Sequence, residues 1–283
     1  MKFLMTLISG LKRSRTKRPI WLVCLEEAVI SRLWHGSGLR NFLFRESHLN
    51  VNDRLSQKEI INLYGVARAK WLASTLEEFC ELNLHGVNLL EVGPGGYLFQ
   101  GLIFQGLGAH YSAVDAFDGE ALSPSAIDEY KQAIESLERD ESLSQEVDIS
   151  QIDVEKIQYF PNRPCEEICR IESLRPPDVI FSHGVLEHLF DIDTAFEQMS
   201  AALKTGGLAV HNIDFYPHDF WRLYRNPLKF LEVPDFLYEF AYPPRRGYAN
   251  RLRHTDFVKA AEEAGFELLA TSDLEEIDPI HVD

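Results

Sequence analysis

The 283-residue sequence predicts an α/β fold built on a doubly wound, mostly parallel sheet. Residues 89–96 have the pattern of a buried strand that runs into a glycine-rich turn. Residues 111–115 have the pattern of a second strand, which ends in the carboxylate of Asp115. Two further strand patterns, 178–182 and 208–212, flank a helical run. Strands that alternate with helices are typical of a parallel sheet.

The amino-terminal segment is basic, although the chain as a whole is acidic. Residues 1–18 hold six of the 28 basic residues and no acidic ones, so the net charge of −16 becomes 22 − 44 = −22 for the remainder. The short apolar stretch precedes the basic residues, the reverse of a secretory signal. We favour a solvated tail on a cytoplasmic protein. The alternative is weak, peripheral contact of residues 1–18 with the inner membrane surface.

Composition excludes several classes of function. Strong acidity argues against non-specific nucleic-acid binding, which depends on neutralising phosphates. The four cysteines are scattered without a Cys-x-x-Cys pair, so neither a metal site nor a disulfide framework is expected. Residues 1–56 are expected to form a partly flexible extension, and residues 57–83 have an amphipathic helical pattern. The main domain is therefore expected to span 57–283.

The glycine-rich turn predicts a nucleoside-like ligand. Glu91 ends the first strand, and Gly93, Gly95 and Gly96 follow, so a ligand can approach the backbone closely. Asp115 comes 115 − 91 = 24 residues after Glu91, a spacing at which a carboxylate can reach ribose hydroxyls. Leu98 stands where a dinucleotide fingerprint has its third glycine, which disfavours a nicotinamide-dependent oxidoreductase. A structural glycine turn in another α/β protein is the plainer alternative.

Motifs further along the chain favour a specific family. Asp178-Val-Ile-Phe-Ser182 leads to Leu186-Glu-His188, and Leu203-Lys-Thr-Gly-Gly207 precedes the strand at 208–212. Together with the glycine turn, these motifs resemble the class I S-adenosylmethionine-dependent methyltransferases. Thr205 replaces the proline that is usual in that family. The resemblance is good over 86–215 and looser to about 270.

The resemblance implies a Rossmann-like fold with S-adenosyl-L-methionine as cofactor. The strand order would be 3-2-1-4-5 and then 6, with the third strand at 156–160 and the sixth at 265–269. The seventh strand of the family would be absent or very short. The implied cofactor-binding residues follow the strand ends and are Glu91, Gly93, Gly95, Gly96, Asp115, Asn162, Glu166 and Ser182. Asn162 and Glu166 are alternatives for the adenine contact.

The acceptor side is expected after the fifth strand. Residues 216–249 are rich in aromatic residues and read as a helical lid, such as would line a small-molecule pocket. We expect a small-molecule or glycan-type acceptor, methylated at oxygen. Histidine suits the removal of a hydroxyl proton near neutral pH. The candidate catalytic residues are His218 and Asp214, followed by His183 and His188, with His211 also considered. The alternative is a non-catalytic regulatory or partner protein that binds S-adenosylmethionine.

Overall fold

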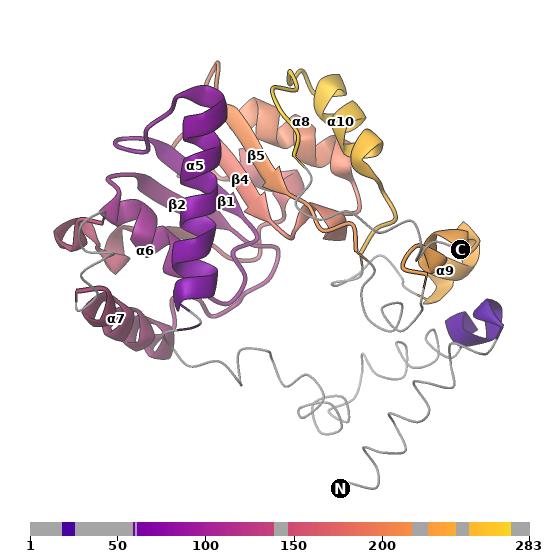
Figure 1. Cartoon of the computed structure of the whole chain (residues 1–283), viewed down its shortest axis with the longest axis horizontal. Helices are drawn as coiled ribbons and strands as arrows, with labels where there is room; N and C mark the ends of the chain where they lie inside the picture. The colour runs from indigo at the N-terminus through magenta and orange to yellow at the C-terminus, as the bar shows by residue number, and fades with distance from the viewer. Residues whose placement is uncertain are drawn as a thin grey trace, which may run out of the picture. The chain divides into compact units, whose positions relative to one another are not determined.

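The computed structural model describes residues 19–25, 59, 61–138, 147–216, 226–241 and 249–272. The chain divides into two compact units. The larger unit comprises residues 50–213 and 254–271, and the smaller one comprises 1–49, 214–253 and 272–283. The larger unit carries the sheet and is shown with its helices in Figure 1.

The sheet is parallel throughout its five strands, in the order β3-β2-β1-β4-β5. This order confirms the prediction for the first five strands. The central position of β1 brings the carboxyl ends of β2, β1 and β4 side by side, where α/β sheets bind their ligands. The strands are β1 (Asn88–Val92), β2 (His110–Val114), β3 (Gln158–Phe160), β4 (Val179–His183) and β5 (Leu208–Asn212).

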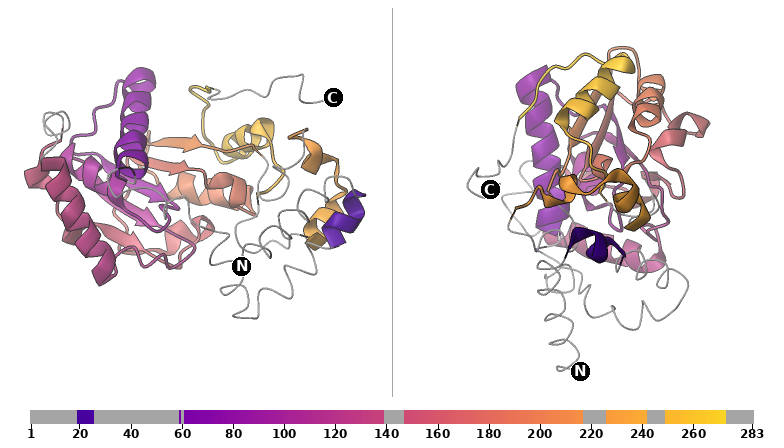
Figure 2. Two further views of the ribbon diagram at one scale, coloured as in Figure 1. Left: turned by 60° about the horizontal axis from the view of Figure 1, so that its bottom comes forward. Right: turned by 90° about the vertical axis from the view of Figure 1, so that its right-hand side faces the viewer.

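One face of the sheet is covered by α5 (Arg68–Cys80) and α6 (Phe99–Gly106), with α7 (Pro124–Glu138) packed beside α6 (Figure 2). The ring of Phe104 on α6 contacts the rings of Tyr111 on β2 and Phe181 on β4. The helix predicted over 57–83 differs at its start, since Ile61–Ala67 (η2) is a π-helix that leads into α5. Gly65 of η2 lies against Phe99, which leaves little space for a larger side chain there.

The opposite face is covered by α8 (Ile192–Ala202), which also packs against α10 (His254–Glu263) and the short helix η5 (Cys165–Arg170). The ring of Phe196 on α8 contacts His211 on β5 and Phe266 after α10. Asp191 caps α8 by accepting a hydrogen bond from the Thr194 amide at 3.0 Å. Short helical turns complete this unit at η3 (Ile149–Gln151), η4 (Val154–Lys156) and η6 (Leu186–His188).

Two expectations about strands are wrong. Residues 265–269 form no sixth strand, because Gly265 ends α10 with a φ of +89° and the Phe266 amide donates back to Ala261. Leu268 and Leu269 are then exposed instead of pairing with β5. The third strand is shorter than predicted and begins at Gln158, since residues 154–156 close the turn η4. The expectation about a seventh strand concerns residues outside the described ranges.

The smaller unit has its own apolar cluster. A helix at 20–25 buries Val23 and Cys24 against Phe230, Val233 and Ala241. The last three come from η8 (Lys229–Glu232) and α9 (Asp235–Ala241) and from the link between them. Two arginines stabilise this unit by contacts with aromatic rings: Arg251 lies over Tyr238, and Arg253 lies over Phe215 and Phe230. Part of the predicted lid at 216–249 is therefore helical, while 217–225 and 242–248 lie outside the described residues.

Candidate cofactor and active site

The glycine turn follows β1 and is held in place at Gly93. Gly93 and Gly95 have φ angles of +68° and +77°, which favour glycine. The Gly93 amide donates to the Val114 carbonyl at 2.8 Å, which ties the turn to β2. A Cβ atom on Gly93 would lie 2.7 Å from the Val185 side chain. Position 93 therefore requires a residue without a side chain, because the loop after β4 packs against its backbone.

The other two glycines face open space. A Cβ atom at Gly95 or Gly96 would meet no other heavy atom within 4 Å. The turn is thus closed towards Val185 at Gly93 and open at Gly95 and Gly96. A ligand can approach the backbone there, and a side chain at Gly96 would occupy that space.

Asp115 is joined directly to this turn. Its Oδ2 accepts a hydrogen bond from the Gly95 amide at 3.1 Å, and its Oδ1 accepts one from the Phe117 amide at 2.8 Å. The residue is 7% exposed, and burial raises the pKa of its carboxyl group, while the two amides oppose that rise. A carboxylate has about four acceptor positions. The two amides leave acceptor capacity for the hydroxyls of a ribose.

Glu91 lies beneath the turn and points into the protein. It is 1% exposed, and its carboxyl oxygens accept hydrogen bonds from the Tyr111 hydroxyl and the Gln100 amide. Burial raises its pKa to about 8, against the lowering effects of Tyr111 and Arg68. Glu91 is therefore largely protonated at neutral pH. The structure gives it the role of holding β1, β2 and α6 together below the glycine turn.

The end of β4 places Ser182 and His183 on opposite faces of the sheet. Ser182 is fully buried and its hydroxyl forms a 2.8 Å hydrogen bond with Nδ1 of His211 on β5. Burial lowers the pKa of His211 to about 4, so its ring is neutral. His183 is half-buried and its ring meets Trp71 edge-on at 5.6 Å. Burial, and then the charge of Arg68, lower the pKa of His183, so it too is neutral and can accept a proton.

Other predicted site residues are less directly connected to the turn. Asn162 follows β3 with a φ of +56° and is exposed. Glu166 lies in η5, half-buried, with a pKa raised by burial. His188 closes η6 after β4 and is half-buried. Asp214 belongs to the smaller unit, where its Oδ1 accepts from the Tyr216 amide at 2.8 Å, and His218 lies outside the described residues.

The comparison with protein families decides which family the chain belongs to. Residues 64–271 match the family model of a methyltransferase domain. The chain belongs to the methyltransferase-domain family. This match begins within η2 and extends beyond α10, and it includes both the glycine turn and the motif after β4. It confirms the methyltransferase family that the motifs indicated.

Several solved methyltransferases match this chain at low sequence identity. Phosphoethanolamine N-methyltransferase 2 of Haemonchus contortus, in complex with S-adenosyl-L-methionine, is 18% identical over 68% of this chain and 36% of its own, with a TM-score of 0.42. The arsenic(III) S-adenosylmethionine methyltransferase of Chlamydomonas reinhardtii is 15% identical over 65% of this chain and 52% of its own, with a TM-score of 0.39. An S-adenosylmethionine-dependent methyltransferase of Mesorhizobium loti is 15% identical over 70% of this chain and 80% of its own, with a TM-score of 0.39. This chain thus spans about a third to a half of the length of the first two. No curated protein sequence matches it.

The structure shows hydrogen-bond partners of the predicted site residues that the sequence motifs did not reveal. Tyr111 and Gln100 bind Glu91, and His211 binds Ser182. Strand alternation alone could have placed Tyr111 near Glu91, because Glu91 pairs with Ala113 and Tyr111 lies two residues earlier on the same face. Gln100 comes from a helix, so no such rule would have found it.

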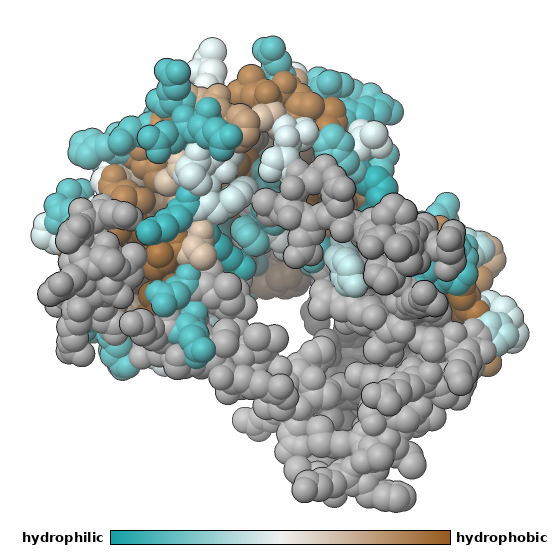
Figure 3. All heavy atoms as spheres, viewed as in Figure 1, coloured by the Kyte–Doolittle hydropathy of each residue, from teal (hydrophilic) through white to brown (hydrophobic). Residues whose placement is uncertain are grey.

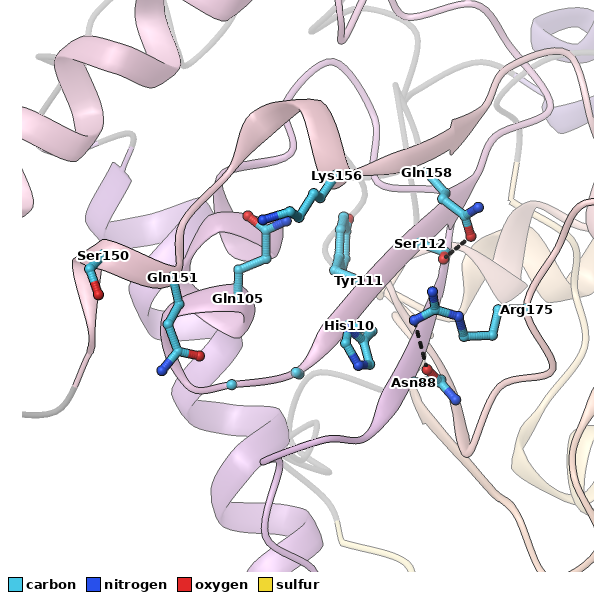
Figure 4. Close-up of a pocket in the computed structure, with 12 residues that line it drawn as sticks. Asn88, Gln105, His110, Tyr111, Ser112, Ser150, Gln151, Lys156, Gln158 and Arg175 are labelled. Carbon is cyan, nitrogen blue, oxygen red and sulfur yellow. Dashed lines mark hydrogen bonds between the residues drawn. The ribbon is translucent and has the colours of Figure 1, made fainter.

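A separate cavity of about 550 Å³ lies at the amino-terminal ends of the strands (Figure 4). Asn88, His110 and Gln158, the first residues of β1, β2 and β3, line it. The Arg175 guanidinium donates to Asn88 Oδ1 at 3.4 Å, and the Ser112 hydroxyl donates to Gln158 at 3.2 Å. The glycine turn follows the other end of β1. This cavity is therefore not the cofactor site.

Two searches concern the described part of the chain alone. Within it, no three or more His, Cys, Asp or Glu side chains are grouped so that they could hold a metal ion. Nor does any helix there combine the length and the apolar character needed to cross a membrane.

Proposed function

We propose that this chain transfers the methyl group of S-adenosylmethionine to an oxygen of a small-molecule or glycan-type acceptor. The hydrogen bond between Asp115 and the Gly95 amide carries the proposal. It joins the predicted ribose-binding carboxylate to the turn that is open at Gly95 and Gly96. A ligand that has a ribose and no phosphate fits this pairing, because the turn lacks the features of a phosphate-binding loop.

Cofactor binding is assigned to the carboxyl ends of the first strands. Asp115 would accept the ribose hydroxyls, and the bare backbone at Gly95 and Gly96 would border the nucleoside. Gly93 and the buried Glu91 support the turn, and Ser182 supports the end of β4. Asn162 and Glu166 remain the two candidates for the adenine contact.

S-adenosylmethionine supplies a methyl group that its sulfonium already activates, so the chain has to orient the acceptor and take its proton. His218 and Asp214, after β5, are the proposed acceptor-side residues. His183 and His188 are the alternatives at the end of β4. His183 fits the role of a base because its neutral form is favoured at neutral pH.

Calorimetry tests the cofactor assignment. The protein should bind S-adenosylhomocysteine and not NADH; binding of NADH alone would overturn the proposal. A metabolite extract incubated with methyl-labelled S-adenosylmethionine then tests catalysis and identifies the acceptor. Tight S-adenosylhomocysteine binding with no transfer to any acceptor would favour the non-catalytic alternative.

A further inference from the structure

Four large apolar side chains are exposed on two helices of the smaller unit. In the helix at 20–25, Trp21 is 53% exposed and Leu25 is 38% exposed. In α9, Phe236 is 70% exposed and Phe240 is 40% exposed. The members of each pair are four residues apart, so each pair lies on one face of its helix. We refer to these four residues as the apolar patch.

The two helices belong to one packed element. Val23 and Cys24, between the exposed residues of the first helix, are fully buried. They lie in the same cluster as Ala241 of α9, and Leu237 and Tyr238 of α9 pack against that cluster. The apolar patch is thus made of the residues that this small core leaves outside. Figure 3 shows hydrophobic residues at the surface around α9, at the right-hand edge of the view.

The charge next to the patch indicates what covers it. The helix at 20–25 directly follows the segment 1–18, which has six basic and no acidic residues. On α9, the Asp235 carboxylate is paired with Arg251, and Glu239 is the helix's other acidic residue. Attraction to an anionic surface therefore comes from the amino-terminal segment and not from α9. Aromatic residues beside a polybasic segment are the combination that binds the interface of an anionic bilayer.

We propose that the apolar patch docks this protein on the surface of anionic lipid bilayers. Trp21, Leu25, Phe236 and Phe240 enter the interface between headgroups and acyl chains, and the basic residues of 1–18 supply the electrostatic attraction. The contact that we propose is with the surface of the bilayer. This inference goes beyond the proposed function and does not depend on it.

Vesicle sedimentation tests the proposal on the full-length chain. The protein should sediment with vesicles of equal parts phosphatidylcholine and phosphatidylglycerol. The variant with Trp21, Leu25, Phe236 and Phe240 all changed to serine should bind at least about tenfold more weakly, since interfacial affinity scales with buried apolar area. The matched control is Leu268→Ser with Leu269→Ser, because these residues are 51% and 62% exposed on the larger unit. That control should bind like the parent.

A second arm tests the electrostatic part. Vesicle binding should weaken when salt is added and when the vesicles contain phosphatidylcholine alone. It should also weaken in the variant with five basic residues changed to glutamine, which are Lys12, Arg13, Arg15, Lys17 and Arg18. Equal binding by the parent and the four-serine variant would overturn the proposal. The proposal would also be overturned if the parent did not bind vesicles, or if it self-associated through the patch in place of binding vesicles.

A third measurement does not depend on the four-serine variant folding. In a variant with Trp34, Trp71 and Trp221 changed to phenylalanine, Trp21 is the remaining tryptophan of the four in the chain. Its fluorescence should shift to shorter wavelength and be quenched by brominated lipids when vesicles are added. Unchanged fluorescence would contradict insertion. S-adenosylhomocysteine affinity of the four-serine variant, measured alongside, separates failure of this proposal from failure of the proposed function.

Discussion

The Tyr111 hydroxyl on β2 donates a hydrogen bond to the buried carboxyl group of Glu91 on β1, beneath the glycine turn. The same carboxyl group accepts from Gln100 on α6, so three elements meet at one acidic side chain. Because burial outweighs these partners, Glu91 titrates near pH 8 and not near its usual value of 4.5. This arrangement makes the stability of the protein depend on pH.

Glu91→Gln should remove that dependence. An acid with a raised folded pKa holds a proton that the unfolded chain releases, so its contribution to stability is lost as pH rises from about 4.5 to about 8. The melting temperature of the parent should therefore fall relative to Glu91→Gln between pH 6.5 and 8. Glutamine can accept one of the two hydrogen bonds through its amide oxygen and can place its NH2 group against the other partner. Parallel melting curves over this range would contradict a raised pKa.

His211→Asn should change the pH dependence of stability on the acidic side. The folded pKa of about 4 lies below the usual histidine value of 6.5, so the unfolded chain binds a proton that the folded chain does not. The parent should lose stability as pH falls from 6.5 to 4, and His211→Asn should lose less. Asparagine can retain a hydrogen bond to Ser182. Chemical denaturation of both proteins at several pH values measures the difference, and equal acid sensitivity would show that His211 does not carry it.

Asp115→Ala should weaken S-adenosylhomocysteine binding by at least about tenfold, since charge-assisted hydrogen bonds contribute about 1.5–3 kcal/mol each. Some stability should also be lost, because the amides of Gly95 and Phe117 lose their acceptor. Asp118→Ala is the matched control, since Asp118 accepts a backbone amide in the same loop, from Glu120 at 3.1 Å. Calorimetry and melting curves on both variants are the measurements. Equal affinities would remove Asp115 from the cofactor site.

Substitutions of two glycines in the turn should have different effects, one on ligand binding and the other on stability. Gly96→Ala should leave the melting temperature nearly unchanged, since its Cβ meets nothing within 4 Å, and should weaken S-adenosylhomocysteine binding. Gly93→Ala should destabilise the fold by about 1–3 kcal/mol or more, because it combines a positive φ with a clash against Val185. Differential scanning calorimetry and binding titrations distinguish the two. Full affinity in Gly96→Ala would show that the ligand does not approach the backbone there.

His218→Ala should retain S-adenosylhomocysteine affinity and lose about a hundredfold in turnover, the usual contribution of a positioned general base. Turnover in the parent should rise with pH through the titration of the imidazole. His183→Gln is the parallel variant, since His183 is the alternative base next to Trp71. Normal turnover in His218→Ala together with a loss in His183→Gln would move the catalytic role to His183.

The strands and the turn were predictable because they rest on short-range patterns. Buried runs, glycines and the carboxylate of Asp115 fix where β1 and β2 end, and the observed Asp115–Gly95 hydrogen bond agrees with that placement. The missing sixth strand was not predictable, since Leu268 and Leu269 have a strand-like composition. What decides their state is whether they pair with β5, which depends on tertiary contacts. The π-helix η2 was not predictable either, and its Gly65 packs against Phe99, a tertiary contact that helix propensity does not encode.

The central place of β1 in the sheet has a consequence for the order of assembly during synthesis. Leu89 pairs with Tyr111, 22 residues later, and with Val179, 90 residues later. The β1–α6–β2 unit can therefore form on a nascent chain well before β4 is made, because closing the shorter loop costs less entropy. Until β4 arrives, one edge of β1 lacks its native neighbour, and the nascent chain is open to mispairing at the strand that carries the glycine turn.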